Sequence, residues 1–567
     1  MDISRQYLLR WVRLTLRRYR LKTYGKNWFN ALVKDKEQWQ AVVGAEKNGP
    51  KILIATSVGS HLAAVALESL LAAALSFRGA DVHVLLCDSL LPACMDCDVS
   101  WFPKQKHFVI NGPGKDLCRN CFWFADKLYS SLGFKVHRYS EFLTGEDITA
   151  AEQISSSTPF EEIEGYIFEG IKVGEHTMAG ALRFCARASL EGEPYAEPIL
   201  RRYFKAALLT TCSVHNLLRR LIFDCVAFHH GIYVPQGLVG EVARREKVRV
   251  VNWNPAYRKR CFIFSQNDTY HHTLMTEKTS KWEGINLSPG LEKELMKYLK
   301  SRWKGTEDWI WFHEKPQVDL TAISNEVGVD FSKPCIGMLT NVMWDAQLHY
   351  PANAFPNMLE WIKQTIEYFG GRPELQLIIR VHPAEIRGVL VTRQPVVGEV
   401  RKAFPELPGN VFIIPPESNV STYAVMSQCN AVIIYGTKTG VELTSMGVPV
   451  IVAGEAWIRN KGITMDAASV EDYFMLLDRL PVNNRMDNAA LSRARKYAFH
   501  FFFRRMIPLE FMVPVKGWPP YRVELKNLDE LMPGRHSGLD VICDGILGGS
   551  DFIFPAEKLM KPQGSEN

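Results

Sequence analysis

The segment from Val432 to Gly454, VIIYGTKTGVELTSMGVPVIVAG, constrains the fold more than any other stretch of the chain. Two apolar runs rich in Val and Ile flank a Gly-Thr-Lys-Thr-Gly turn and a helical stretch that is barely two turns long. Runs of this composition are typical of strands that are buried on both faces of a parallel sheet. A strand, a glycine-rich turn, a short helix and a second strand make up half of a nucleotide-binding unit.

The same alternation of strands and helices occurs in both halves of the chain. Because 567 residues exceed what one hydrophobic core usually fills, we expect two domains of roughly 200 to 250 residues. The predicted fold is α/β, with two doubly wound, Rossmann-type domains that face a cleft. The predicted divisions are a basic helical segment at 1–49, a first domain at 50–330 with a cysteine-rich insertion at 87–122, a second domain at 331–482, and a C-terminal helix and extended tail at 483–567.

Short apolar runs mark the predicted strands. In the first domain they lie at 51–56, 81–87, 135–139, 248–251 and 261–264, with one more inside 223–237. In the second domain they lie at 335–339, 375–381, 411–414, 431–435 and 449–453. Open parallel sheets bind ligands outside the carboxyl ends of their strands, so functional residues are expected directly after these runs.

Charge argues against one class of partner and suggests another. The net charge of +6 is too small to indicate a nucleic-acid-binding protein. Within residues 1–27, however, there are many Lys and Arg residues and only one acidic residue, Asp2. Apolar side chains recur among these residues near helical spacing. This pattern fits an interfacial helix on an anionic membrane, and a solvated helix packed on its own domain is an equal alternative. Since no signal peptide is predicted, we expect a cytoplasmic protein, with association at the inner membrane face as the finer expectation.

A histidine follows the apolar run at 375–381. In IIRVHPAE, residues 378–385, the strand delivers His382 and Pro383 to its carboxyl end, where the imidazole could hold a phosphate or a leaving oxygen. Arg380 would point to the same side, because alternate residues of a strand share a face. A lone histidine after a strand is more often structural, and this alternative stays open.

The glycine-rich turn of the opening segment offers an anion site. Backbone N–H groups, hydroxyls and an amine at a helix start suit a phosphate, and they come from Gly436, Thr437, Lys438, Thr439 and Gly440. Glu442, one turn into the helix, could accept hydrogen bonds from ribose hydroxyls. The turn lacks the upstream glycine and the length of a Walker motif, and a tight structural turn is the alternative.

A third polar loop follows the next strand, in AGEAWIRNKGITMD, residues 453–466. Glu455, Arg459 and Lys461 lie close together in it, and the two cations suit a carboxylate or a phosphate of the substrate. Taken alone, this cluster would be interpreted as a solvated loop.

Four cysteines have the spacing of a metal site. Cys94 and Cys97, with Cys118 and Cys121, form a C-x2-C-x20-C-x2-C pattern at the upper edge of zinc-ribbon spacing. Two chelating thiolate pairs would close a tetrahedral site, so structural zinc is favoured. The alternatives are an iron–sulfur cluster, four unrelated thiols, and disulfides, which a cytosolic location disfavours.

Histidines also follow strands of the first domain. His61 comes after the first strand, and His230 ends the run inside 223–237. Either imidazole could act as the base that activates an acceptor hydroxyl. A core or capping histidine is the more common case for each.

Together, the motifs of the second half resemble those of bacterial capsule polysaccharide biosynthesis proteins. These are GT-B glycosyltransferases that include Kdo transferases, and they look distantly like sialyltransferases with a His-Pro motif. The likeness rests on RVHPAE, on STY at 421–423 and on TGVELTSMGVPVIVAGEAWIRNKGITMD, and it covers residues 335–480, with a weaker likeness over HHGIYVPQG. Lys438 departs from the small hydroxyl residues expected at its position, so the donor need not be a CMP-sugar.

The resemblance implies a nucleotide-sugar donor held mainly by the second domain, with His382 as a catalytic residue. The resemblance implies that His382 and the loop from Thr437 to Glu442 contact the phosphates and ribose of the donor. Together with the residues argued from the sequence itself, the predicted donor-binding residues are Arg380, Pro383, Glu385, Gly436, Thr437, Lys438, Thr439, Gly440, Glu442, Arg459 and Lys461. The predicted function is a metal-independent transfer of a sugar from this donor to a glycan or lipid-linked acceptor in capsule or surface polysaccharide biosynthesis, with no redox or nucleotide cofactor. The alternatives are a nucleotide-sugar epimerase or a polyol-phosphate transferase on the same fold, or a non-catalytic scaffold that binds nucleotide or glycan.

Overall fold

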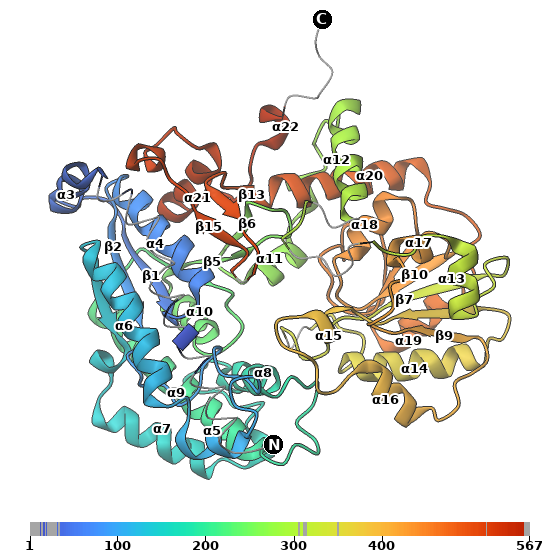
Figure 1. Cartoon of the computed structure of the whole chain (residues 1–567), viewed down its shortest axis with the longest axis horizontal. Coiled ribbons are helices and arrows are strands. Elements are labelled where there is room, and N and C mark those ends of the chain that lie inside the picture. The colour runs from blue at the N-terminus through green and yellow to red at the C-terminus, as the bar shows by residue number, and fades with distance from the viewer. Residues whose placement is uncertain are drawn as a thin grey trace, which may run out of the picture. The chain divides into compact units, whose positions relative to one another are not determined.

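The computed structural model divides the chain into two compact units (Figure 1). It describes residues 34–303, 307–309, 315–346, 348, 351–517 and 519–560, together with residues 12, 15, 16, 19 and 31. Unit 1 comprises Met1–Cys185, Leu190–Tyr270 and Met506–Phe554. Unit 2 comprises Ala186–Ser189, His271–Arg505 and Pro555–Asn567.

Unit 1 is built on a doubly wound sheet with strand order β13-β6-β5-β4-β1-β2-β3. The strands β1 to β5 are parallel, whereas β6 and β13 pair antiparallel at one edge. The strands are β1 (Lys51–Ser57), β2 (Asp81–Leu86), β3 (Lys135–Arg138), β4 (Cys225–His229), β5 (Arg249–Pro255), β6 (Cys261–Gln266) and β13 (Ile507–Pro508), and a separate ribbon pairs β14 (Met512–Pro514) with β15 (Tyr521–Val523). The helices are α3 (Lys36–Gly44), α4 (Leu62–Ser76), α5 (Gln105–Asn111), α6 (Lys115–Ser131), α7 (Gly145–Ser157), α8 (Val173–Cys185), α9 (Ala196–Arg220), α10 (Gln236–Arg245) and α21 (Ser537–Gly548).

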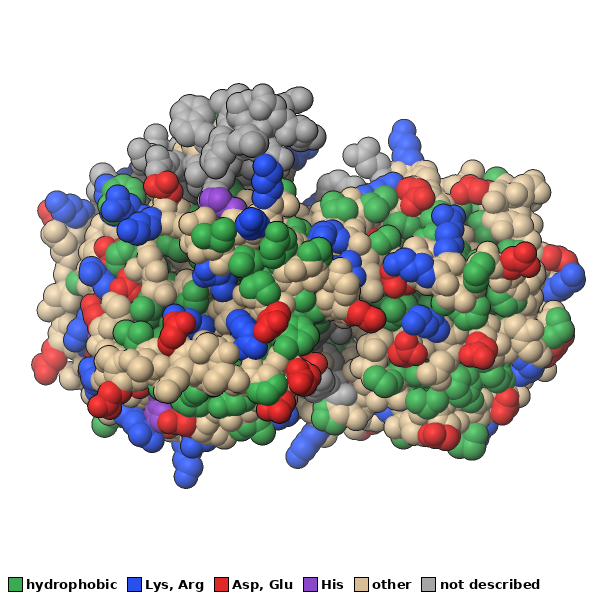
Figure 2. Space-filling view, turned by 90° about the horizontal axis from the view of Figure 1, so that it is seen from below, with side chains coloured by type: hydrophobic (Ala, Val, Ile, Leu, Met, Phe, Trp, Pro, Cys, Tyr) green, Lys and Arg blue, Asp and Glu red, His purple; other side chains and the backbone are tan. Residues whose placement is uncertain are grey.

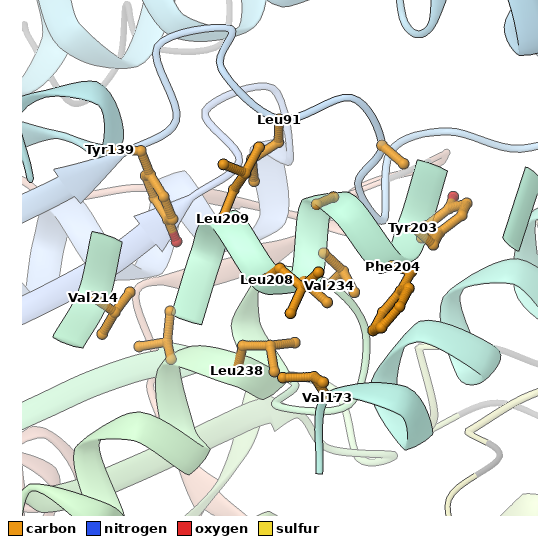
Figure 3. Packing of buried hydrophobic residues seen from close by; sticks show 14 of the residues in the cluster. Leu91, Tyr139, Val173, Tyr203, Phe204, Leu208, Leu209, Val214, Val234 and Leu238 are labelled. Atoms are coloured by element: carbon orange, nitrogen blue, oxygen red, sulfur yellow. The ribbon is translucent and has the colours of Figure 1, made fainter. Parts of the chain in front are cut away.

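Packing on the central strand explains why this sheet forms. Six of the seven residues of β1 are buried, as expected of a strand covered on both faces. Leu53 and Ala55 share one core cluster with the apolar face of the long helix α9. Figure 3 shows Leu208 and Leu209 of α9 in this cluster, close to Val234 and Leu238. Burial of this apolar surface is the main force that holds the helical layer to the sheet.

Unit 2 has an all-parallel sheet with strand order β12-β11-β10-β7-β8-β9. The strands are β7 (Cys335–Leu339), β8 (Gln376–Arg380), β9 (Val411–Ile414), β10 (Ala431–Ile434), β11 (Val450–Val452) and β12 (Met465–Asp466). The helices are α11 (Tyr270–Thr276), which starts at the unit boundary, α12 (Pro289–Arg302), α13 (Leu320–Val327), α14 (Met358–Gly370), α15 (Ala384–Arg387), α16 (Val396–Ala403), α17 (Thr422–Met426), α18 (Thr439–Ser445), α19 (Val470–Leu477), α20 (Asn488–Phe499) with the π-helix η4 (His500–Arg504), and α22 (Ala556–Leu559).

Two doubly wound domains in one chain confirm the predicted α/β, GT-B-like class. The unit boundaries differ from those predicted. The first domain was expected to reach residue 330, yet His271 and the residues that follow belong to unit 2, while Met506–Phe554 returns to unit 1. The difference arises because α12 packs on α20 and β13 pairs with β6, contacts between segments that are distant in the sequence.

The predicted cysteine-rich insertion has a different form. Much of 87–122 is helical, because α5 lies within it and α6 already begins at Lys115. Helix α6 is the crossover between β2 and β3, so Cys118 and Cys121 belong to the regular α/β architecture. The predicted basic helix at 1–27 lies outside the described residues, apart from four positions.

Surface charge is mixed on the face seen in Figure 2, where Lys and Arg side chains alternate with Asp and Glu. Within the part of the chain that the structure describes, no helix has the length and apolar character needed to cross a bilayer.

Candidate functional site

The predicted site residues of unit 2 gather where its strand order reverses. Successive strands are added on one side of β7 up to β9 and on its other side from β10 onwards, so the strand order reverses between β7 and β10. Ligands of doubly wound folds bind at the carboxyl ends of the strands at such a point. Thr340 directly follows β7, Gly436 lies just beyond β10, and His382 lies just beyond the neighbouring β8. The backbone N–H of His382 donates to Oγ1 of Thr340 at 3.1 Å, which ties two of these strand ends together.

His382 has a defined tautomer. Its Nδ1 accepts the backbone N–H of Ala384 at 3.1 Å, so in the neutral imidazole the proton is assigned to Nε2. Burial, with the charges of Lys438 and Arg380, lowers the pKa of His382 to about 4. The side chain is therefore a neutral hydrogen-bond donor at pH 7, a state suited to an anionic oxygen.

Lys438 belongs to a buried ion network. Its Nζ lies 2.9 Å from Oε1 of Glu442, and Nε of Arg302 lies 3.0 Å from Oε2 of the same carboxylate. The hydroxyl of Tyr423 also donates to Oε2. Burial opposes ionisation of Glu442, but Arg302, Lys438 and Tyr423 outweigh it and lower its pKa to about 2. Protein groups thus engage both oxygens of the residue predicted to contact ribose.

Glycines bring the 436–440 loop close to its neighbours. A Cβ on Gly440 would lie 2.6 Å from Cδ1 of Ile434, so a side chain at this position would require that methyl group to shift. Oγ1 of Thr437 donates to Oγ1 of Thr439 at 3.2 Å. The loop therefore presents backbone, two hydroxyls and the Lys438 amine after β10.

The structure places the other predicted residues of the His-Pro segment inside unit 2. Arg380 is 2% exposed, and its guanidinium donates to the carbonyls of Pro415 and Ser418. Glu385 is fully buried, its Oε1 accepts the N–H of Val396 at 3.2 Å, and burial raises its pKa to about 7. Pro383 precedes α15. In these positions the three residues can support the turn that carries His382.

Arg459 and Lys461 are also buried and bonded to backbone. Arg459 donates to the carbonyls of Gly454 and Ala467, and Nζ of Lys461 donates to the carbonyls of Met275 and Glu277. Burial lowers the pKa of Lys461 to about 8. Their predicted contact with a donor remains a prediction, and in this structure both side chains brace loops.

Unit 1 has its own reversal point, between β4 and β1. His61 follows β1, and its ring stacks on that of His229, at the end of β4, with centroids 4.7 Å apart. His230 stacks in turn on Tyr233 at 5.0 Å. Ser57 and His230 both have positive φ, 56° and 65°, a conformation that costs free energy in residues other than glycine. Such strain at two adjacent strand ends is a common feature of functional sites.

His61 and His230 differ in what they can do. Nδ1 of His61 caps α4 by accepting the N–H of Ala64 at 3.3 Å, which assigns its proton to Nε2. His230 is only partly buried, whereas His229 behind it is 4% exposed. His61 is partly buried as well, so the assignment of either residue as the base stays a prediction.

The four predicted zinc ligands form one close pair. Sγ of Cys94 and Sγ of Cys97 lie 3.9 Å apart, close to the edge of a tetrahedral thiolate site. Sγ of Cys121 instead accepts the N–H of Ser60 at 3.3 Å. Among the residues that the structure describes, no group of three or more His, Cys, Asp or Glu is placed to hold a metal ion, and the zinc site stays a prediction.

Sequence reasoning missed several residues of these sites. Arg302 and Asp308 lie outside every predicted motif. The packing of α12 on α20 brings Arg302 to Glu442, and Asp308 pairs with Arg302. Glu68 lies in α4 and is not among the predicted site residues. It is 1% exposed and accepts a hydrogen bond from Nε1 of Trp253 at 3.0 Å. A lone carboxylate in an Ala-rich helix was the one signal for it.

A family model matches part of the second half of the chain. Residues 328–490 match the family described as "Capsule polysaccharide biosynthesis protein", which confirms the predicted resemblance over those residues. A search of curated proteins gave no match.

Solved structures give more distant likenesses. The β-Kdo 2,4 transferase of Thermosulfurimonas dismutans KpsC is 12% identical, over 48% of this chain and 79% of that one, with a TM-score of 0.31. The UDP-GlcNAc 2-epimerase of Neisseria meningitidis is also 12% identical, over 79% of this chain and 98% of that one, with a TM-score of 0.26. Similarities this low carry no argument about activity.

Proposed function

We propose that the protein is a glycosyltransferase that moves a sugar from a nucleotide-sugar donor to a glycan or lipid-linked acceptor in capsule or surface polysaccharide biosynthesis. The observation that carries this proposal is the position of His382 and Lys438 at the reversal point of the unit 2 sheet, within the residues that match the capsule family. A neutral Nε2–H donor after β8 and an ammonium group after β10, the strands on either side of β7, suit the phosphate of a nucleotide.

In this proposal unit 2 stabilises the leaving group. Negative charge develops on the donor phosphate as the bond to the sugar breaks. The Nε2–H of His382 and the ammonium of Lys438 would donate to that oxygen more strongly as its charge grows. Preorganised donors of this kind are worth about 10²–10³ in rate each, because they need no reorientation during the reaction.

Unit 1 would supply the base. The acceptor hydroxyl loses its proton to His230, whose backbone is fixed by a 2.9 Å bond from its N–H to the carbonyl of Trp253. A neutral imidazole near pH 7 is the usual acceptor for such a proton. Peripheral contact with a membrane through residues 1–27 is part of the proposal and rests on the sequence alone.

A nucleotide panel tests donor binding. The thermal midpoint of the protein is measured with CMP, UDP, GDP, CDP and ADP, for the wild type, for His382→Ala and for the control His536→Ala, which lies in unit 1 outside both sites. A ligand at 100 times its dissociation constant adds about 2.7 kcal/mol to stability, which such a measurement detects. We expect one nucleotide to stabilise the wild type and the control and to have a much smaller effect on His382→Ala. Failure of every nucleotide would favour the scaffold alternative.

A further inference from the structure

Arg302 is the most unexpected member of the ion network in unit 2. It is the last residue of α12, a helix that packs on α20, as does α18, which carries Glu442 (Figure 1). Its side chain is 5% exposed and that of Glu442 is 1% exposed. A charge buried this deeply must stay paired, because breaking such a pair leaves an uncompensated ion in a medium of low polarity.

The partners of Arg302 fix its orientation. Nε lies 3.0 Å from Oε2 of Glu442, and Nη1 donates to the hydroxyl of Tyr298 at 3.0 Å and to Oδ2 of Asp308. The Tyr298 hydroxyl in turn donates to Oδ1 of Asp308 at 2.8 Å. The guanidinium also lies over the rings of Tyr298 and Phe502. These contacts hold the arginine rigidly, so it can orient the carboxylate it meets.

Glu442 is 1% exposed, and both of its carboxylate oxygens have partners within the protein. One of its oxygens is taken by Arg302 and by the Tyr423 hydroxyl, and the other by Lys438. The hydroxyl of Tyr423 donates to this carboxylate, and the ring of Tyr423 stacks on that of Trp303 with centroids 5.6 Å apart. Lys438, at 16%, has the most exposed side chain of the Arg302–Glu442–Lys438 series. A ligand that approaches the 436–440 loop would therefore meet the ammonium group first.

We propose that Arg302 is a positioning residue for the donor phosphate: by fixing the carboxylate of Glu442, it holds the ammonium of Lys438 where the phosphate binds. In this arrangement Glu442 orients Lys438 and does not contact the ribose. The inference rests on the proposed nucleotide site. It adds that the site depends on a residue in α12, far from the loop in the sequence.

The test compares nucleotides with their nucleosides. Dissociation constants are measured for UDP and uridine, or for CMP and cytidine if the panel selects that base, and their ratio reports the phosphate contribution. In the wild type we expect the nucleotide to bind at least about tenfold more tightly, as charge-assisted hydrogen bonds allow. Both Arg302→Met and Lys438→Met should lose most of this preference, whereas Arg302→Lys should recover part of it. Nucleoside affinity should stay within about twofold in all three variants.

A double variant distinguishes a positioning role of Arg302 from a general disruption of the structure around the site. If Arg302 acts through Lys438, Arg302→Met should change the ratio little when Lys438→Met is already present. A full further loss in the double variant, or an unchanged ratio in Arg302→Met alone, would overturn the inference while leaving nucleotide binding intact. If Arg302→Met does not fold, the triple variant Arg302→Met, Glu442→Gln and Asp308→Asn removes Arg302 together with the two carboxylates that pair with it, and the same loss of phosphate preference is expected.

Amine labelling keeps the test independent of the donor. The acylation rate of Lys438 is measured at a fixed alkaline pH by mass spectrometry. The charge of Arg302 helps burial to lower the pKa of Lys438, so Arg302→Met should raise that pKa and slow labelling severalfold. An unchanged rate would show that Arg302 does not act on Lys438. Absence of nucleotide binding by the wild type, with slowed labelling, would refute the proposed site and leave only the ion network.

Discussion

Nδ1 of His382 accepts the backbone N–H of Ala384 at 3.1 Å, and this bond fixes the neutral tautomer of the imidazole. Burial and two nearby cations lower the pKa of His382 to about 4. We therefore predict that the ring does not titrate between about pH 5.5 and 8, unlike an ordinary histidine with a pKa near 6.5. Histidine-labelled NMR, with His382→Gln to assign the Cε1 resonance, checks this. A midpoint near 6.5 would show that the ring is a proton carrier.

A histidine pair in unit 1 should make the fold sensitive to acid. Nδ1 of His83 lies 2.7 Å from Nε2 of His137, and Nε2 of His83 lies 3.2 Å from Asp81. Burial, then the charges of His83, Lys135 and Lys51, lower the pKa of His137 to about 4, and burial lowers that of His83 despite Asp81.

The unfolded chain then binds more protons than the native state below pH 6.5. The stability contributed by neutral His137 is present above pH 6.5 and is lost as pH falls from there towards 4. We predict that His137→Gln flattens the fall in unfolding free energy over this window by about 1–2 kcal/mol. Urea unfolding at several pH values measures the effect, and His536→Gln is the control. An equal slope in His137→Gln would contradict the assignment.

Glu68 should show the opposite pH dependence. Burial raises its pKa from 4.5 to about 7, despite hydrogen bonds from Thr56 and Trp253. Since the native state then holds a proton that the unfolded chain releases, stability falls as pH rises from 4.5 to 7. We predict that Glu68→Gln is more stable than the wild type by about 2 kcal/mol at pH 8, with little difference at pH 4. A variant less stable at pH 8 would show that the carboxylate is ionised and paired.

The cysteine pattern predicts structural zinc, and Sγ of Cys94 lies 3.9 Å from Sγ of Cys97, a spacing that two ligands of one ion can have. Metal analysis of protein purified without added zinc decides between a zinc site and four separate thiols. One equivalent of zinc, lost in Cys94→Ser with Cys97→Ser and retained in the control Cys212→Ser, would require Cys118 and Cys121 to turn towards the first pair. No metal in the wild type would leave the four residues as separate thiols.

The sequence predicted the strands of both sheets except the two-residue edge strands β12 and β13, and it predicted the loops that carry His382, Lys438, His61 and His230, because apolar periodicity and strand-end position are local properties. It did not predict that Glu442 is shared by two cations. Arg302 reaches that carboxylate only through the packing of α12 on α20, which no local pattern encodes. Burial of Arg459 and Lys461 was missed for the same reason, since a cation-rich loop looks solvated until its carbonyl partners are known.

Acceptor-dependent turnover is the most direct test of the central claim. The protein is incubated with a nucleotide-sugar that carries the base selected by the nucleotide panel, with and without a capsular oligosaccharide. The masses of the products are measured by mass spectrometry. We predict that nucleotide release rises when the acceptor is added, that the acceptor gains the mass of one sugar, and that His382→Ala slows both by about 10²–10³. Conversion of the sugar without an acceptor, or binding without turnover, would contradict the assignment as a glycosyltransferase.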